Sequence, residues 1–203
     1  MKRLKKLTNI LLSEHEWIMS IRRKLFLIQC LLETNNVVGD VVEIGCYKGL
    51  NSVLIQTTLN ICGSDKSLHL YDSFEGLPEW TDKDRSFRIS SHYPAGKFKA
   101  HPEDVIENFK KYKLKEPTIH VGMIEEATDF PQQISLAFID LDLYEGTMSA
   151  FSKVWPLMSP GGILILDDFG FDDLPGVERA GREFFGDSIS FARQAEITGI
   201  VRK

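Results

Sequence analysis

Residues 134–170 read ISLAFIDLDLYEGTMSAFSKVWPLMSPGGILILDDFG, and this stretch decides the fold. Two short apolar runs, Leu136 to Ile139 and Ile163 to Leu166, have the length and composition of strands buried on both faces of a parallel sheet. Between them, Thr147 to Leu157 has helical spacing, and Ser159-Pro-Gly-Gly is expected to end that helix. The stretch therefore predicts a strand, a helix and a second, parallel strand.

Each of the two apolar runs ends in acidic residues. Asp140 and Asp142 follow the first run, and Asp167 and Asp168 follow the second. The carboxyl ends of parallel strands lie on one edge of a sheet, where like charges are costly unless a cation or a proton separates them. An oxygen-only cluster favours Mg²⁺ first, with Mn²⁺ or Ca²⁺ as alternatives. Solvated strand ends or helix N-caps remain the other interpretation.

Composition indicates one soluble globular domain. The chain has 203 residues, 43% of them hydrophobic, which is enough for one well-buried core, so residues 1–203 are predicted to form a single domain. A formal net charge of -5 argues against nonspecific nucleic-acid binding. The three cysteines lack metal-ligand spacing and indicate reduced thiols, so a cytoplasmic location is expected.

The first 36 residues are predicted to form a helical cover or lid. Ile18, Ile21, Leu25, Ile28 and Leu32 recur at spacings of three and four, and the charged run 22–24 is expected on the opposite side. No apolar run approaches the roughly 20 residues of a membrane span. A contact surface for a second copy of the chain is a weaker alternative for these helices.

A glycine-bearing turn follows the first predicted core strand. Val37 to Ile44 reads as that strand and continues into Glu43-Ile-Gly45-Cys-Tyr-Lys-Gly49. Glycine at a strand end lets a ligand approach bare backbone at a helix N-terminus. A second strand, Leu68 to Tyr71, ends in Asp72, the position that holds ribose hydroxyls in α/β nucleoside-binding folds. The glycine turn together with Asp72 predicts an adenosine-containing ligand. S-adenosylmethionine fits better than ATP or NAD, because the sequence has no P-loop motif and no third glycine for a pyrophosphate.

The remaining segments complete an alternating pattern. Residues 74–101 form a long polar stretch with interspersed aromatic residues, interpreted either as a flap that contacts the acceptor or as surface packing. Helices are expected at Pro102 to Tyr112 and Pro175 to Phe185, and a strand at Thr118 to Val121. Ile189 to Arg193 and Gly199 to Arg202 are expected to form a closing hairpin. Residues 37–203 are thus an α/β core with a mostly parallel sheet flanked by helices and a C-terminal antiparallel hairpin.

Five motifs together resemble the macrocin O-methyltransferase family. They are VVEIGCYKG at 41–49, YDSFEGLP at 71–78, FIDLDLY at 138–144, PGG at 160–162 and DDFG at 167–170. The resemblance implies a Rossmann-like class I methyltransferase fold. It also implies an S-adenosylmethionine-dependent, Mg²⁺-dependent enzyme that methylates a hydroxyl of a sugar or glycosylated small molecule.

The resemblance and the motifs give three sets of expected site residues. The expected metal ligands are Asp140, Asp167 and Asp168. The expected cofactor contacts are Glu43, Gly45, Cys46, Tyr47, Gly49, Asp72, Ser73, Gly122, Met123 and Asp140. Asp140, Asp142 and His92 are the candidates for proton transfer, and His101 ranks with His92 behind the acids.

Two functions from other classes stay open on the sequence alone. The same edge of the sheet is compatible with a metal-dependent hydrolase, or with a noncatalytic module that binds an adenosine ligand. The hydrolase needs neither Gly45 nor Asp72, whereas the transferase needs both.

Overall fold

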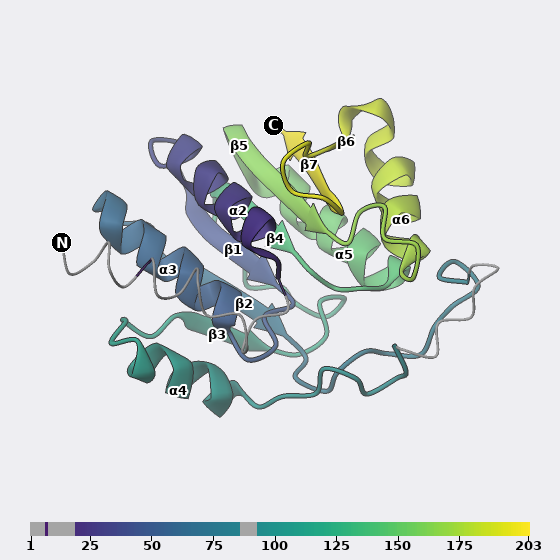
Figure 1. The fold of residues 1–203 in the computed structure, drawn as a ribbon, viewed down its shortest axis with the longest axis horizontal. Coiled ribbons are helices and arrows are strands. Elements are labelled where there is room, and N and C mark those ends of the chain that lie inside the picture. Colours follow the sequence, from purple (N-terminus) through teal and green to yellow (C-terminus); the bar gives the residue numbers. More distant parts are fainter. Residues whose placement is uncertain (1–6, 8–18, 86–92) are drawn as a thin grey trace.

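A seven-stranded sheet forms the centre of the molecule in the computed structural model, which describes residue 7 and residues 19–85 and 93–203. The strand order is β3-β2-β1-β4-β5-β7-β6 (Figure 1). β1 to β5 pair in parallel, and β7 pairs antiparallel with both β5 and β6. The strands are β1 (Asp40–Ile44), β2 (Leu68–Asp72), β3 (Thr118–Val121), β4 (Ile134–Ile139), β5 (Met158–Asp167), β6 (Ser190–Phe191) and β7 (Thr198–Arg202).

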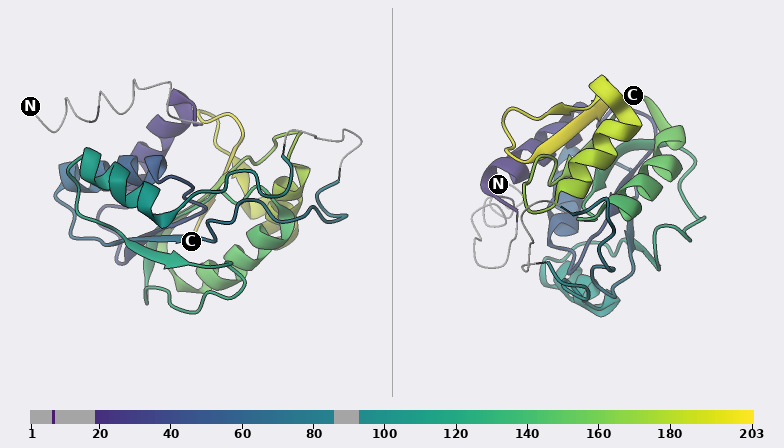
Figure 2. Two further views of the ribbon diagram at one scale, coloured as in Figure 1. Left: turned by 90° about the horizontal axis from the view of Figure 1, so that it is seen from below. Right: turned by 90° about the vertical axis from the view of Figure 1, so that its right-hand side faces the viewer.

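Helices cover both faces of this sheet (Figures 1 and 2). One face carries α2 (Ile21–Glu33), α3 (Leu50–Cys62) and α4 (Pro102–Lys111), and the other carries α5 (Tyr144–Val154) and α6 (Pro175–Phe185). Two short 3₁₀ segments, Trp155–Leu157 and Gly186–Ser188, follow α5 and α6. The expected α/β class with a C-terminal hairpin is therefore confirmed. Within the described residues no helix is long and apolar enough to cross a membrane.

The starts of β1 and β5 differ from the prediction, and the helix expected at Thr147 to Leu157 is observed as Tyr144–Val154. β1 begins at Asp40 rather than Val37. β5 begins at Met158, so Ser159-Pro-Gly-Gly belongs to the start of the strand instead of a turn before it. At β5 strand pairing extends past the local turn residues, since Met158 pairs with Ile134 of β4, whereas at β1 strand pairing does not extend before Asp40.

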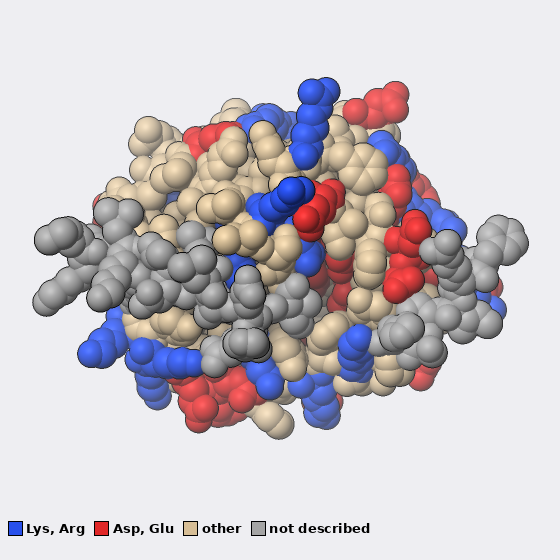
Figure 3. All heavy atoms as spheres, viewed as in Figure 1, with Lys and Arg blue, Asp and Glu red and all other residues tan. Residues whose placement is uncertain are grey.

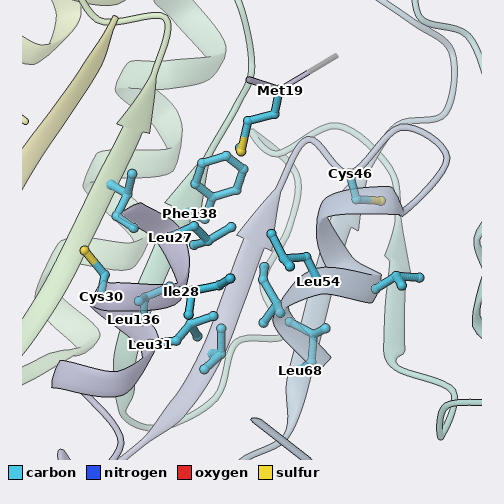
Figure 4. Close-up of a cluster of buried hydrophobic side chains, with 14 of the residues drawn as sticks. Met19, Leu27, Ile28, Cys30, Leu31, Cys46, Leu54, Leu68, Leu136 and Phe138 are labelled. Atoms are coloured by element: carbon cyan, nitrogen blue, oxygen red, sulfur yellow. The ribbon is translucent and has the colours of Figure 1, made fainter. Parts of the chain in front are cut away.

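The buried face of α2 is not the face that the spacing predicted. Ile21, Leu25 and Leu32 are about half exposed, at 47%, 50% and 55%. The core instead receives Lys24, Phe26, Leu27, Ile28, Cys30 and Leu31. Figure 4 shows Leu27, Ile28 and Leu31 directed toward Leu136 and Phe138 of β4. Apolar residues surround most of this helix, so two faces satisfied the helical spacing and packing against the sheet selected between them.

The order of the strands reverses between β1 and β4. In open α/β sheets, ligands bind outside the carboxyl ends of the strands at such a reversal. The N–H of Asp140 donates to the carbonyl of Ile44 at 2.8 Å, and the N–H of Gly45 donates to the carbonyl of Tyr71 at 2.8 Å. These bonds fix the ends of β1, β2 and β4 beside one another and define the position of the site.

The loop after β2 runs past the carboxyl ends of the strands (Figure 1). Its two described arms pair with each other, because Leu77 N donates to Lys97 O and Gly96 N donates to Leu77 O, both at 2.8 Å. Asp84 anchors the first arm to the body of the protein. Its carboxylate is buried and accepts from the N–H and hydroxyl of Thr81 and, at 2.7 Å, from the N–H of Tyr144 at the start of α5.

We predict that Asp84→Ala destabilises the protein by about 3 kcal/mol, because it leaves a buried N–H at the α5 N-terminus and the Thr81 donors without their acceptor. The free energy of unfolding, measured by denaturant titration, tests this. Asp82→Ala is the matched control, because Asp82 lies two residues away and its side chain is 92% exposed. Equal stability of the two variants would contradict the anchoring role of Asp84.

Candidate active site

A cavity of about 850 Å³ opens at the carboxyl ends of β1, β2, β3, β4 and β5. Residues that follow each of these five strands line it, together with Met19 and Arg23 from the N-terminal side and residues of the loop after β2. The cavity combines apolar walls with a few polar groups, which is the usual composition of a small-molecule site. It lies at the strand-order reversal, where the sequence placed the site.

The turn after β1 forms one wall of the cavity with bare backbone. Gly45 has φ +82°, and a Cβ on it would lie 1.8 Å from the carbonyl oxygen of Asp140. The turn is held by Asp72, whose Oδ2 accepts from the N–H groups of Cys46 and Tyr47 at 2.8 Å each and whose Oδ1 accepts from Phe74 N at 2.7 Å. Asp72 therefore organises the turn as well as lining the cavity.

Glu43 lies beneath the cavity and is absent from its lining. The side chain is fully buried, accepts a hydrogen bond from the Ser52 hydroxyl of α3, and has its pKa raised by burial to about 8. Glu43 thus lies between β1 and α3, outside the cavity lining, and its expected contact with a cofactor stays a prediction. A residue inside a buried strand alternates with cavity-facing positions, and the motif alone did not reveal which side Glu43 faces.

Three carboxylates converge on one side of the cavity. Asp140, Asp142 and Asp168 each place one oxygen within 4.8 Å of the others. Burial is the largest cause of the shifts in their pKa values, and neighbouring charges add to it: the pKa of Asp140 rises well above its usual range, that of Asp142 rises to about 6 and that of Asp168 to about 8. Such a cluster is stable only with protons or a cation among its oxygens.

Asp167 adjoins this cluster but faces a different partner. Its Oδ2 accepts from Arg23 Nη1 of α2 at 2.8 Å, and the same guanidinium nitrogen lies 3.7 Å from Asp168 Oδ1. The other oxygen, Oδ1, is buried and has no hydrogen-bond partner among the residues that the structure describes. The metal set expected from the sequence was Asp140, Asp167 and Asp168, whereas the closest grouping of oxygens contains Asp142 in place of Asp167.

Aromatic residues form another part of the cavity wall. Tyr93 and Phe98 of the loop, Phe171 after β5 and Tyr47 all line it. Tyr93 contacts the edges of both Phe98 and Phe171, with ring centroids 6.2 and 6.3 Å apart, and Lys97 Nζ lies 3.9 Å from the Tyr93 ring centroid. The long aromatic-bearing stretch seen in the sequence thus contributes directly to the cavity wall.

Most of the expected site residues meet in this cavity. Those that line it are Gly45, Cys46, Tyr47, Asp72, Ser73, Gly122, Met123, Asp140, Asp142, Asp167 and Asp168. Gly49 instead begins α3, with φ +75°. His92 lies outside the described residues, and His101 is the N-cap of α4, outside the cavity lining.

Arg23 is the site residue that the sequence did not indicate. The charged run 22–24 was expected to lie on the solvent side of the helix, yet Arg23 reaches Asp167 and Lys24 is only 2% exposed. No local pattern distinguishes this arginine from a solvated one, since its partner lies 144 residues away in the chain.

A family model and curated relatives, all of them O-methyltransferases, match this chain. The family model described as macrocin-O-methyltransferase (TylF) matches residues 19–188. The chain is 33% identical over 157 residues to 8-demethyl-8-(2,3-dimethoxy-alpha-L-rhamnosyl)-tetracenomycin-C 4'-O-methyltransferase of Streptomyces olivaceus, covering 71% of this chain and 59% of the relative. It is 28% identical over 163 residues to demethyldecarbamoylnovobiocin O-methyltransferase of Streptomyces niveus, covering 75% and 62%. The chain therefore spans about three fifths of the length of these curated relatives.

Solved structures share the fold. The O-methyltransferase NovP superposes with a TM-score of 0.78 at 24% identity, covering 91% of this chain and 80% of that one. The calicheamicin methyltransferase CalS11 superposes with a TM-score of 0.75 at 18% identity, covering 99% and 91%. At these identities the likeness concerns the fold.

We predict that the metal-free protein becomes less stable as the pH rises from about 5 to about 8. The raised pKa values of Asp142 (about 6), Asp168 (about 8) and Glu43 (about 8) mean that the folded state binds more protons than the unfolded state, where these groups titrate near pH 4. Stability is highest below the unfolded-state pKa values and is lost as the pH passes through the folded-state values.

Denaturant titrations in EDTA across this pH range test the prediction, with Asp168→Asn expected to show a shallower loss. Carboxylates with lowered pKa values, such as Glu33, change their contribution only in more acidic solution and do not mask the effect. A stability that rises between pH 5 and 8 would contradict the crowding of these acids.

Proposed function

This chain belongs to the macrocin O-methyltransferase family, and we propose that it is an S-adenosylmethionine-dependent O-methyltransferase that acts on a hydroxyl of a sugar or glycosylated small molecule. The observation that carries the proposal is the joining, in one cavity, of the glycine turn with Asp72 and of the carboxylate cluster. The first suits an adenosine ligand and the second suits a divalent cation. Neither a hydrolase nor a simple binding module requires both.

The cofactor fits the wall built by β1, β2 and β3. Gly45 has no side chain to displace the backbone of Asp140, so the turn after β1 packs closely on the end of β4, and Gly45, Gly122 and Met123 all line this wall. A carboxylate has about four lone-pair positions, so after accepting three backbone N–H groups Asp72 retains about one position for a ribose hydroxyl. When bound, S-adenosylmethionine supplies an electrophilic methyl group on a sulfonium.

The carboxylates fit a hard divalent cation, with Mg²⁺ as the first choice. Asp140, Asp142 and Asp168 already place three oxygens close together, and Asp167 adds a buried oxygen without a hydrogen-bond partner in the described part of the chain. A bound cation supplies positive charge that orients acceptor hydroxyls and lowers their pKa. Asp140, Asp167 and Asp168 remain the proposed ligands from the family resemblance, with Asp142 able to join or replace Asp167.

Asp142 is the proposed proton acceptor. Its carboxyl group has a pKa raised to about 6 by burial, so it is ionised at neutral pH and more basic than an exposed aspartate. Asp140 is the alternative acceptor, since it lies in the same cluster. The pKa of about 6 applies to the metal-free protein, and a bound cation would lower it, so the proposal rests on the place of Asp142 in the cavity beside the cluster.

The aromatic side of the cavity is the proposed acceptor site. Tyr93, Phe98 and Phe171 line the same cavity as the acids, and their flat apolar rings suit the C–H faces of a sugar ring or an aromatic aglycone. The acceptor's hydroxyls would then face the acids. This arrangement supports a glycoside or sugar acceptor over an extended polymer.

A small molecule remains the proposed partner. Acidic and basic side chains are interspersed on the face in Figure 3, without a broad basic area among its described residues, and the net charge is -5. This charge distribution argues against nucleic acid as a partner. Cytoplasmic location and association through the N-terminal helices stay predictions.

Isothermal titration with S-adenosylhomocysteine, with and without Mg²⁺, tests the proposed function. We expect wild type to bind the product analogue and Asp72→Ala to bind it more weakly by about 1.5 to 3 kcal/mol, because hydrogen bonds to a charged acceptor are lost. Since Asp72 also holds the turn after β1, part of this loss reflects loosening of the turn. Glu75→Ala is the control, because Glu75 is nearby but exposed.

A second set of measurements separates the alternatives. Asp168→Asn should retain binding of S-adenosylhomocysteine, gain less thermal stability from Mg²⁺ and lose most methyl transfer. Analogue binding with no metal response in wild type would favour a binding module. A metal response without analogue binding would favour a hydrolase.

A further inference from the structure

Arg23 brings a positive charge to the edge of the carboxylate cluster. Its Nη1 lies 2.8 Å from Asp167 Oδ2 and 3.7 Å from Asp168 Oδ1. The side chains of Arg23, Asp167 and Asp168 are only 12%, 5% and 15% exposed, so water screens these charges poorly. The guanidinium is thus a strong and local influence on the acids.

The ion pair and the candidate cation cluster share residues. Asp168 belongs to the group of three whose oxygens lie within 4.8 Å of one another, and Asp167, the last residue of β5, precedes it in the chain. A divalent cation on Asp168 would lie close to the guanidinium, and a cation that also used Asp167 would compete with Arg23 for that carboxylate. Charge repulsion by the guanidinium and its competition for Asp167 both weaken cation binding.

The guanidinium is held where it is by the packing of α2. Ser20 caps the helix, with its Oγ accepting from Arg23 N at 3.4 Å and donating to Glu196 at 3.1 Å. Leu27 and Leu31 on the same helix are buried against the sheet (Figure 4). Because the backbone at residue 23 is fixed in this way, Arg23 remains near the acids when their other partners change.

We propose that Arg23 is a positioning residue that competes with the divalent cation for Asp167 and Asp168 and thereby weakens and tunes cation binding at this site. The inference rests on the proposed function, since it assumes that these acids hold a cation. It also assigns a role in the site to the N-terminal helix, which otherwise serves as a cover. In the metal-free protein, Arg23 takes the place of a counter-ion for two of the four acids.

The test measures cation binding directly, with Mg²⁺ and Mn²⁺ titrated calorimetrically into the protein without cofactor or acceptor. Arg23→Gln removes the competing charge and should bind both ions more tightly, on the order of tenfold, which corresponds to about 1.4 kcal/mol. Arg23→Lys keeps the positive charge but loses the planar guanidinium group. Its affinity for the cations should therefore lie between that of wild type and that of Arg23→Gln. Arg22→Gln is the matched control, because Arg22 is the neighbouring arginine on the same helix and is exposed.

Thermal melting gives a second readout. Without metal, Arg23→Gln should melt below wild type because the buried Asp167 loses its counter-ion. Addition of millimolar Mg²⁺ should raise the melting temperature of Arg23→Gln by more than it raises that of wild type. A purely structural arginine would lower the melting temperature in both conditions and leave cation affinity unchanged or weaker.

A double-mutant cycle with Asp167→Asn locates the effect. Without Asp167 the main ion pair of Arg23 is absent, so Arg23→Gln should change cation affinity less in that background than in wild type. Equal or weaker cation binding by Arg23→Gln would overturn the inference while leaving the cation site intact. An equal gain in Arg22→Gln would overturn it in favour of long-range charge. Absence of cation binding by wild type would overturn both this inference and the proposed cation site.

Discussion

The gathering of four carboxylates at the ends of β4 and β5 is the constraint on which the rest of the site depends. Asp167 is buried and Asp140, Asp142 and Asp168 are partly buried, so water screens their mutual repulsion incompletely. Burial and the neighbouring charges raise their pKa values, which favours bound protons in the metal-free protein, and Arg23 adds a positive charge beside them. A bound cation would reduce the repulsion among these carboxylates further. The proposed cation site and the stability of the fold therefore depend on the same four side chains.

The site also concentrates unusual backbone geometry. Tyr47, Phe74, Phe98, Asp142 and Asp168 all have positive φ, between 50° and 63°, although none is glycine. All of these residues except Phe74 line the cavity. Residues in this region cost free energy and persist where the surroundings fix them, as Asp72 does for Tyr47 and Phe74. The turns thus place the acids and the aromatic rings where regular strands would not.

The N-terminal helix and the loop after β2 hold the site from its two sides. α2 packs on β4 and supplies Arg23, whereas the loop supplies Tyr93 and Phe98 and is tied to α5 through Asp84. Neither segment belongs to the strand and helix alternation that builds the sheet. The parts of the cavity wall that these two segments supply are consequently formed by chain whose conformation depends most on long-range contacts.

The sequence by itself determined the sheet core, the glycine turn and the acids at the strand ends, because these follow from local periodicity, from turn chemistry and from the rule that parallel strands end on one edge. Tertiary structure decided three other matters. Helical spacing on α2 allowed two buried faces, and packing selected Leu27 and Leu31 over Leu25 and Leu32. The direction of Glu43 depended on the α3 contact with Ser52. The role of Arg23 depended on an ion pair with Asp167 across 144 residues, a separation at which no local pattern carries information.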